Sequence, residues 1–242
     1  MRPRTPRGTI SRHQVVDAAL TVADRDGLHR VSIRAVAAEV GVPPMTLYTH
    51  FAGKEQLYDL MFERVFHRLF DTAGSATWQA EFEAGCRSAR RVLLAHPHWL
   101  PLLTRVTAPP ASIRFFDRLL RHMRADGFTW DAALYAFSSA MSFALGFVLV
   151  ERMMAGGRDA PVPVQRLALV KATIAREPPK AFAAIAWAAP HFDEWSFDNV
   201  FDLGLRSLIV GIEERCSRPP PARKRGARRS ARRTPPGRRQ TA

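Results

Sequence analysis

Apolar residues recur every three or four positions through most of this chain, and this helical period constrains its fold more than any other feature. After a basic, proline-containing arm over residues 1–10, Ser11 can cap a first helix and Gly27 can end it. The expected apolar face of this helix consists of Val16, Ala19, Leu20 and Ala23. The period therefore predicts an amphipathic helix near the start of the chain.

Three further helices are expected directly after the first. Ser32 can cap a second helix that Gly41 ends, and a short third helix is expected over Met45–His50 after Pro44, since proline is tolerated in a first helical turn. A longer fourth helix follows, and its inward positions are Leu57, Leu60, Met61 and Val65. Short helices joined by tight glycine turns are typical of a helix-turn-helix unit, here over residues 11–64.

The remainder of the chain keeps the helical period, and no run alternates as a β-strand does. The further helices that we expect are Trp78–Leu94, Trp99–Leu103, Ala111–Ala125, Trp130–Met154, a less defined pair between Val164 and Ala189, and Ser196–Arg215. The sequence thus predicts an all-α fold, in which a long helix joins an N-terminal three-helix unit to a helical ligand-binding and dimerisation domain over residues 65–217.

The positive charge of the chain is concentrated in its last residues. The formal net charge is +14, but ten of the basic residues lie in a Pro/Arg/Ala-rich tail over residues 218–242, which leaves +4 for residues 1–217. This composition predicts a disordered tail. Our favoured interpretation is that the tail adds non-specific affinity for phosphates; the alternatives are a solvated extension or, least favoured, a membrane or partner role.

One stretch, Ala132–Val150, has no charged residue and nearly the length that spans a bilayer. Because three serines and Tyr135 interrupt it, we expect a central helix that other helices bury on all sides. No signal peptide is evident, since no apolar segment follows the basic N-terminus. Cys86 and Cys216 lack a zinc-ligand pattern and suit a reducing cytosol, so we expect no disulfide role for them.

The segment Ser32-Ile33-Arg34-Ala35-Val36-Ala37, then Gly41-Val42-Pro43-Pro44-Met45-Thr46-Leu47-Tyr48-Thr49-His50-Phe51 and Lys54, resembles the DNA-binding domain of the TetR family of transcriptional regulators. This resemblance covers about the first quarter of the chain and implies sequence-specific binding to double-stranded DNA. It also implies a bacterial cytoplasmic, nucleoid-associated protein. The expected DNA contacts are Ser32, Arg34, Pro44, Met45, Thr46, Tyr48, Thr49, His50 and Lys54.

The residue types suit this interface. Arg34 can bind a guanine through two hydrogen bonds, and Thr46 can reach a base edge or a thymine methyl group. Tyr48, His50 and Lys54 suit phosphate oxygens, as do the N–H groups of the helix that Ser32 caps. The alternatives are that the ring of Tyr48 packs on the first helix and that His50 and Lys54 are merely solvated. Leu47 and Phe51 are expected in the core, and the arm residues Arg2, Arg4 and Arg7 either follow the DNA or remain in solvent.

Later segments are similar to the regulatory domain of the tetracycline-repressor type: Asp126-Gly127-Phe128-Thr129, Ala133-Leu134-Tyr135-Ala136, Leu145-Gly146-Phe147-Val148-Leu149 and Phe201–Glu213. The resemblance implies a homodimer, with the helices at 130–154 and 196–215 forming a four-helix bundle with a second subunit. Gly204, Ser207 and Gly211 would permit close helix approach beside an apolar face. The alternative is that these helices only form the core of one chain.

The resemblance breaks at the metal site. Tetracycline repressors bind a drug–magnesium chelate through a histidine and a glutamate, and an ungapped register places Leu103 and Val150 at those positions. His96 and His98 lie out of register, and Glu151 lies one residue away. We therefore expect no metal site, no cofactor and no magnesium-dependent tetracycline binding.

The residues expected around a ligand are mostly apolar, namely Phe70, Trp99, Leu103, Phe115, Phe116, Leu119, Leu134, Phe137 and Met141. Such a lining suits an unidentified small hydrophobic or aromatic molecule, with Arg105 and Arg114 as less favoured polar anchors. The alternative is that these residues simply form the core of a helical bundle.

The leading hypothesis is a repressor that a ligand releases from a palindromic operator with half-sites about one helical turn apart. The alternative is a non-specific DNA-binding protein driven by the tail. No nucleophile–base pair or phosphate-binding glycine loop is present in the sequence, so we expect no enzyme activity.

Overall fold

The computed structural model describes residues 10–70, 75–105, 110–154, 162–178 and 180–216 of the chain. Within these ranges the regular structure is entirely helical, which confirms the expected all-α fold. The arginines of the N-terminal arm and the whole basic tail lie outside the described residues. The expectation that the tail is disordered concerns these residues and stays a prediction.

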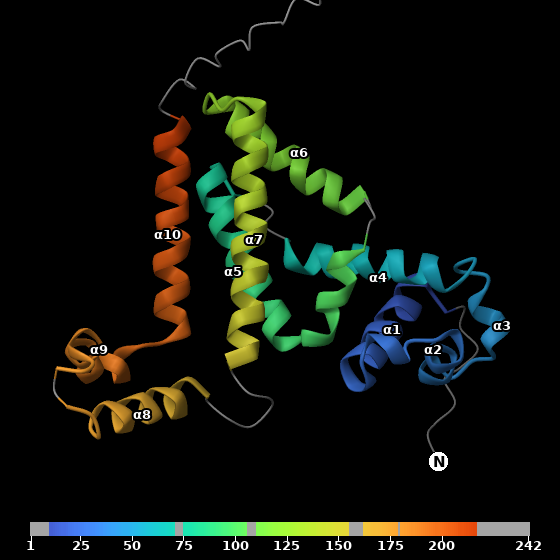
Figure 1. Ribbon diagram of the computed structural model, residues 1–242. Helices are drawn as coiled ribbons and strands as arrows, with labels where there is room; N and C mark the ends of the chain where they lie inside the picture. The colour runs from blue at the N-terminus through green and yellow to red at the C-terminus, as the bar shows by residue number, and fades with distance from the viewer. Residues whose placement is uncertain (1–9, 71–74, 106–109, 155–161, 179, 217–242) are drawn as a thin grey trace, which may run out of the picture.

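The first three helices form a compact unit that we call the head (Figure 1): α1 (Arg12–Asp26), α2 (Ile33–Val40) and α3 (Pro44–Leu47), with the short 3-10 helix η1 (Leu28–Arg30) between α1 and α2. Ser11 caps α1 through a capping box with Gln14, which confirms the predicted start. Gly27 and Gly41 have φ angles of 88° and 81°, a region that favours glycine, so both helices end where the sequence predicts.

Helix α4 (Lys54–Leu69) leads from the head to the remaining helices (Figure 1). Leu57, Met61 and Val65 are buried along one face, as the period predicts, and Leu60 is half-buried. One continuous helix therefore connects the two parts.

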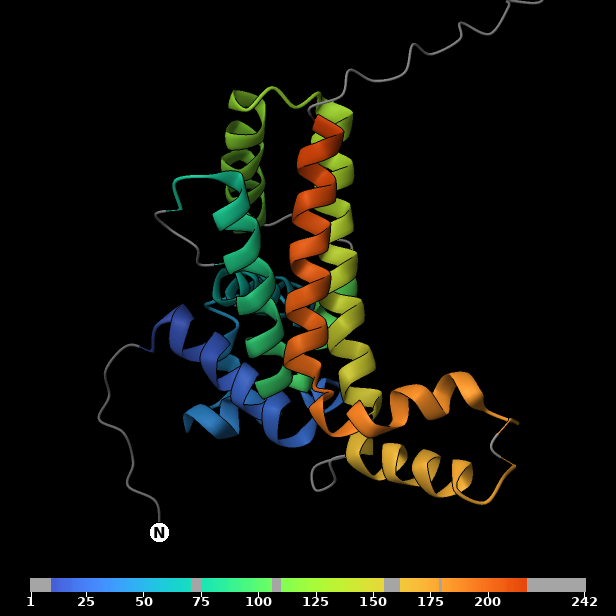
Figure 2. The same cartoon turned by 90° about the vertical axis from the view of Figure 1, so that its left-hand side faces the viewer.

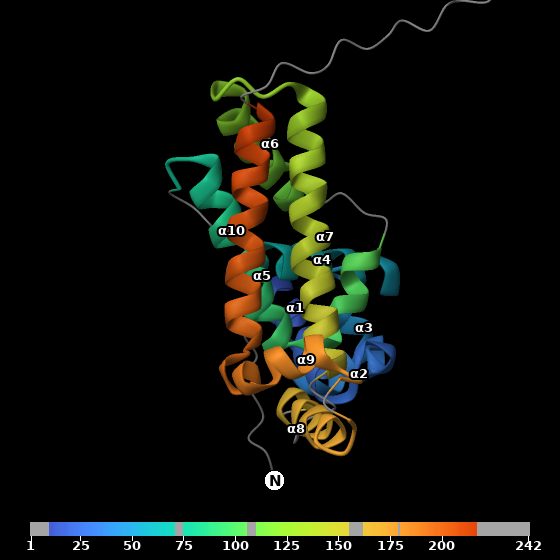
Figure 3. The ribbon, with the colours of Figure 1, turned by 60° about the vertical axis from the view of Figure 1, so that its left-hand side comes forward.

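The second part is a helical bundle of α5 (Trp78–Ala95), α6 (Pro110–Ala125), α7 (Trp130–Met154) and α10 (Phe197–Cys216), with the 3-10 helix η2 (Pro97–Thr104) after α5. These four α-helices begin and end within one residue of the expected positions. Helices α7 and α10 run side by side in opposite directions along most of their length (Figures 2 and 3). The close approach that Gly204 permits is within the chain, since a Cβ atom there would lie 2.7 Å from the ring of Phe143.

Two short helices, α8 (Val162–Ile174) and α9 (Ala183–Ala188), continue into the 3-10 helix η3 (Ala189–Glu194) and extend beside one end of α7 and α10 (Figures 1 and 2). No residue of α9 is buried in the described structure. The less regular pattern of this part of the sequence therefore reflects helices that face solvent.

The expectation that the apolar helix at 132–150 is buried on all sides is wrong for the single chain. Helix α7 buries one narrow face of small residues: Ala133, Ala136, Ala140, Ala144 and Val148. Its opposite face exposes Tyr135, Leu149, Val150 and Met153. By length and composition α7 could cross a membrane, but its alanine face packs on α5, α6 and α10 as the core helix of a bundle.

Candidate DNA interface and regulatory cavity

The segment from Pro44 to His50 forms a shorter α-helix than the sequence predicts. Regular α-helix ends at Leu47, and the next residues continue as a turn in which the His50 N–H donates to the Leu47 carbonyl over 2.9 Å. The Thr49 hydroxyl donates to the Thr46 carbonyl over 2.7 Å, which competes with longer α-helical bonding. The recognition segment is therefore one helical turn followed by a tighter one.

The nine predicted DNA contacts lie at the start of α2, in α3 and the turn after it, and at the start of α4. Leu47 and Phe51 are buried, as expected, and anchor the α3 segment to the core. Thr46 and His50 are half-buried, whereas the exposed members are Ser32, Arg34, Pro44, Met45, Tyr48, Thr49 and Lys54. Ser32 caps α2 by accepting from the Ala35 N–H over 3.2 Å, so the first turn of α2 has the expected form.

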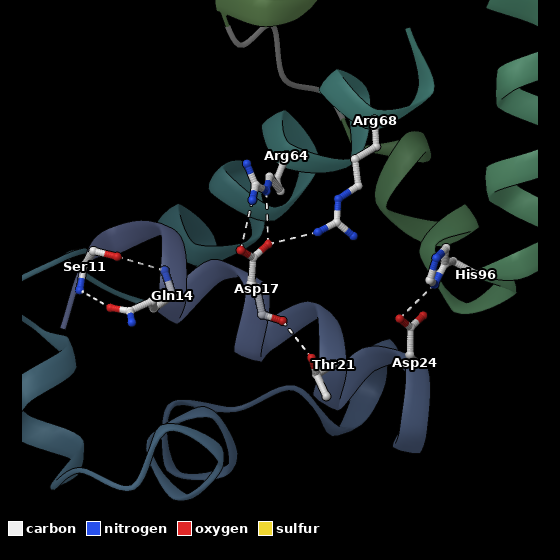
Figure 4. A network of polar contacts seen from close by, with 8 residues as sticks. All are labelled: Ser11, Gln14, Asp17, Thr21, Asp24, Arg64, Arg68 and His96. Atoms are coloured by element: carbon white, nitrogen blue, oxygen red, sulfur yellow. Dashed lines mark hydrogen bonds and ion pairs between the residues drawn. The ribbon is translucent and has the colours of Figure 1, made fainter. Parts of the chain in front are cut away.

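Asp17 of α1 links the head to α4 through two arginines (Figure 4). Arg64 donates to both carboxylate oxygens of Asp17 over 3.0 Å, and Arg68 donates to one of them over 3.1 Å. Paired bonds of this kind fix the orientation of the two groups better than a single contact. Helix α1 is therefore held at a defined angle to the C-terminal half of α4.

A second polar contact joins α1 to the corner between α5 and η2 (Figure 4). The Asp24 carboxylate lies 2.9 Å from Nδ1 of His96. The imidazole also stacks on Trp99, with 3.8 Å between the ring centroids, and the Arg68 guanidinium lies 5.3 Å from the same indole. Helix α1 is therefore attached at two points. Asp17 binds the arginines of α4, and Asp24 binds His96, which stacks on Trp99.

A cavity of about 280 Å³, counting its open mouth, lies between the end of α4 and helices α5, α6 and α7. Five of the nine predicted ligand residues line it, namely Phe70, Phe115, Leu119, Phe137 and Met141. The rings of Phe70 and Phe115 lie 4.6 Å apart, so aromatic faces form one wall. Because this volume includes open solvent, the enclosed space is smaller than that of a typical small-molecule site.

Four of the predicted ligand residues do not line this cavity. Phe116 is half-buried and packs on Phe137, with 4.0 Å between the ring centroids. Trp99 is fully buried, but it packs against His96 and Arg68 at the junction with the head. Leu134 is exposed on α7, because its position is rotated away from the alanine face. Leu103 is half-buried in η2, and it is absent from the cavity wall.

The cavity lining also includes residues that were not predicted: Phe82, Gly85, Cys86, Ala140 and Ala144. The sequence signal for these residues was the presence of small side chains on α5 and α7, because small residues leave space opposite large aromatic side chains. Burial raises the pKa of the Cys86 thiol to about 12, so the thiol is neutral at physiological pH. The lining therefore contains no charged group.

Two family models match the chain and together cover most of it. The model of the bacterial regulatory proteins of the tetR family matches residues 15–61, and the tetracyclin repressor-like C-terminal domain matches residues 72–216. The second match alone covers more than half of the chain.

The chain belongs to the TetR family.

Relatives of this TetR-family protein include repressors that align with it along most of their length. The HTH-type transcriptional repressor DrrR1 of Streptomyces coeruleorubidus is 28% identical over 222 residues, covering 87% of this chain and 80% of the relative. The class D tetracycline repressor protein of Escherichia coli is 28% identical over 209 residues, covering 84% of this chain and 89% of the repressor. Membership in the family makes the protein a ligand-responsive, DNA-binding transcriptional regulator.

The fold is shared with solved TetR-family structures. ActR from Streptomyces coelicolor, crystallised in complex with actinorhodin, superposes with a TM-score of 0.67 at 23% identity, covering 88% of this chain and all of ActR. A TetR variant from Acinetobacter baumannii, in complex with minocycline, gives a TM-score of 0.60 at 20% identity, covering 86% of this chain and 99% of the variant.

In this TetR-family member the cavity does not fit a metal chelate, because its lining offers neither a carboxylate nor an imidazole. Glu151, one residue from the predicted glutamate register, pairs with Arg90 through two contacts of 2.8 Å. The side chains of both residues are more than four-fifths buried, and Arg90 also lies 2.6 Å from Asp198. Arg90 thus joins α5 to Glu151 of α7 and to Asp198 of α10. Val150 is exposed on the outer face of α7.

Proposed function

We propose that this protein is a homodimeric repressor that leaves a palindromic operator when an uncharged hydrophobic ligand enters the cavity between α4, α5, α6 and α7. The observation that carries the proposal is the position of α4. Lys54, next to the recognition segment, begins this helix, and Phe70, in the cavity wall, follows its last turn. A single helix therefore connects the candidate DNA surface to the candidate ligand site.

The proposed division of the chain follows from this arrangement. Residues 11–64 bind DNA, residues 65–217 bind ligand and form the dimer, and the segments 1–10 and 218–242 add basic charge on either side. A protein with this task acts in the cytoplasm, where the chromosome is. The division is supported by the position of α4, whose N-terminal end follows the head and whose C-terminal end, at Phe70, reaches the cavity.

Within the head, Arg34 and Thr46 are proposed to read base edges, while Tyr48, His50, Lys54 and the α2 N-terminus bind phosphates. Exposure supports these roles for Arg34, Tyr48 and Lys54. The half-buried Thr46 has its backbone N–H bonded to Pro43, so its side chain is held at a fixed place on the helix surface. Removing a two-bond contact to guanine costs about 1–3 kcal/mol of binding free energy, mostly at one base position.

The dimer is proposed to form through the exposed faces of α7 and α10. On α7 the exposed residues repeat at helical spacing, as Tyr135, Ser142, Gly146, Leu149 and Met153. On α10 the matching stripe is Val200, Leu203, Ser207, Val210 and Gly211. Since the two helices lie side by side (Figure 3), the stripes form one apolar face. Such a face on a soluble protein usually marks an interface.

The ligand is proposed to be a compact aromatic or polycyclic molecule without a net charge. Phenylalanine rings and aliphatic groups surround the cavity, and the only polar group among its lining side chains is the protonated thiol of Cys86. An ionised ligand group would lose its hydration there without gaining a partner, which costs several kcal/mol. ActR with actinorhodin and the A. baumannii TetR with minocycline are relatives in complex with polycyclic molecules.

Ligand entry is proposed to shift the C-terminal end of α4, and thereby the spacing of the two heads in the dimer. The shift in operator affinity can only equal the difference in ligand affinity between the two arrangements. Asp17 and Asp24 hold the head to α4 and η2, so the head would move with them rather than independently.

The test is selection of bound duplexes from a random DNA library with the wild-type protein and with Arg34→Ala. We expect a palindromic motif for the wild type and loss of preference at one position in each half-site for the variant. A motif unchanged by Arg34→Ala would overturn the base contact. If no motif is enriched, and deletion of residues 218–242 removes most binding, the protein is instead a non-specific DNA-binding protein.

A further inference from the structure

Arg105, the residue that ends η2, reaches from the bundle to the N-terminal half of α4. Its Nη2 atom donates to the Glu55 carboxylate over 2.7 Å and lies 3.4 Å from the Asp59 carboxylate. The Arg105 side chain is only 25% exposed, whereas Glu55 is 79% exposed. The guanidinium is therefore held in place by packing, and the acid that it meets lies at the surface.

The same contact involves Tyr58, one turn from the start of α4. The Arg105 guanidinium lies 5.1 Å from the centre of the Tyr58 ring, and the Lys54 ammonium lies 5.2 Å from it. The Tyr58 hydroxyl donates to the Leu28 carbonyl of η1 over 3.2 Å. Tyr58 therefore contacts Arg105 of the bundle, Lys54, which we propose to bind phosphate, and the backbone of the head.

We propose that Arg105 is a positioning residue for DNA binding, which raises operator affinity by neutralising Glu55 and Asp59 beside Lys54. The inference rests on the proposed DNA contact of Lys54, and it assigns to a residue of the bundle a direct electrostatic effect on the DNA surface. Arg114, also considered as a polar anchor, is exposed and has no part in this cluster.

Electrostatics gives the direction of the effect. Two carboxylates one turn apart, next to a lysine that approaches phosphate, repel the DNA backbone unless a cation balances them. Arginine keeps its charge at every physiological pH, and its planar group suits a carboxylate better than lysine does. Arg105 thus leaves the positive charge of Lys54 and of the α4 N-terminus available to phosphate.

The experiment compares Arg105→Gln with the control Arg121→Gln, which loses the same charge from an exposed ion pair with Asp117 on α6. Dissociation constants are measured on the duplex selected from the random library and on an unrelated duplex, at several salt concentrations. We expect Arg105→Gln to bind both duplexes about fivefold more weakly at 0.1 M salt, and Arg121→Gln less than twofold more weakly. The loss should shrink as salt increases.

A second substitution separates charge from structure. In the Arg105→Gln background, Glu55→Gln should restore most of the lost affinity, because it removes the charge that Arg105 balanced. Arg105→Lys should retain most of the affinity of the wild type. The proposal is overturned if Arg105→Gln binds as the wild type does, or if Glu55→Gln fails to restore a loss, which would indicate a packing role alone. Failure of the wild type to select a motif would instead count against the proposed function, while the unrelated duplex still tests Arg105.

Discussion

The carboxylate of Asp24 and the imidazole of His96 lie 2.9 Å apart, although 72 positions separate them in the sequence. The contact joins α1 of the head to the corner between α5 and η2, and the stacked Trp99 ring holds the imidazole from the other side. Together with the contacts of Asp17 to Arg64 and Arg68, it makes α1 the element through which the head is oriented on the bundle.

We expect Asp24→Ala and His96→Ala each to loosen the head, and the double variant to be no worse than the poorer single one. Both groups are about one-third exposed, so their coupling free energy should be modest, about 0.5–1 kcal/mol. The measurement is a double-mutant cycle by urea unfolding, with amide hydrogen exchange in α1 as a local readout. Strictly additive effects would show that the two side chains are neighbours without a stabilising interaction.

Filling the cavity should abolish binding of a neutral naphthylamine dye. Ala144→Leu places a larger side chain among Phe70, Phe115 and Met141, at a packing cost of about 1–3 kcal/mol. Ala125→Leu, at the exposed end of α6, is the control. Fluorescence titration should give at least tenfold weaker dye binding for Ala144→Leu only. Equal binding by both variants would place the dye site elsewhere.

Alkylation of Cys86 should be slow in the folded protein. Burial raises the pKa of its thiol to about 12 from 9.0, and the thiolate is the reactive form. In a Cys216→Ser variant at pH 8, iodoacetamide should label the native protein about 100-fold more slowly than the unfolded chain. The native rate should rise about tenfold with each pH unit below that pKa, whereas a rate that levels off near pH 9 would mean an ordinary thiol.

A charge on the outer face of α10 should prevent dimer formation. Leu203 is 65% exposed in the single chain, so Leu203→Arg leaves the fold of the protomer unstrained but puts a cation into the proposed interface. Sedimentation equilibrium should give the mass of one chain for this variant and of two for the wild type. Ile113→Arg, on the exposed side of α6, is the matched control and should remain dimeric. A dimeric Leu203→Arg protein would locate the interface on another surface.

Helix positions were largely predictable, because a long amphipathic pattern and its caps are local properties. Trp130–Met154 has the expected bounds, and Ser11 and Gly27 delimit α1 as expected. The third helix is shorter than predicted, since the hydroxyl of Thr49 bonds to the backbone of its own turn. The predicted helix at Trp99–Leu103 is a 3-10 helix with Pro101 inside it, which lacks the N–H that an α-helix would use.

The lining of the cavity was predictable where it consists of large side chains, and less so where it depends on the space that small residues leave. Phe70, Phe115 and Phe137 were identified from their size and apolar character. Gly85 and Ala144 were missed, because a small residue contributes to a cavity only through the packing of other helices around it. The outer face of α7 was missed for a related reason: a helix that is apolar on all sides does not reveal which side has a neighbour within the chain.

Leu47 is the only residue of α3 that is buried in the core of the head, while Met45 and Tyr48 beside it expose 74% and 47% of their surfaces. A duplicated gene can therefore accumulate substitutions at these outward positions without unfolding its product. Under the proposed function, changes on this surface would alter operator binding, while the cavity, at the far end of α4, would keep its ligand. The DNA sites and the ligand of such a regulator can therefore change at separate rates during evolution.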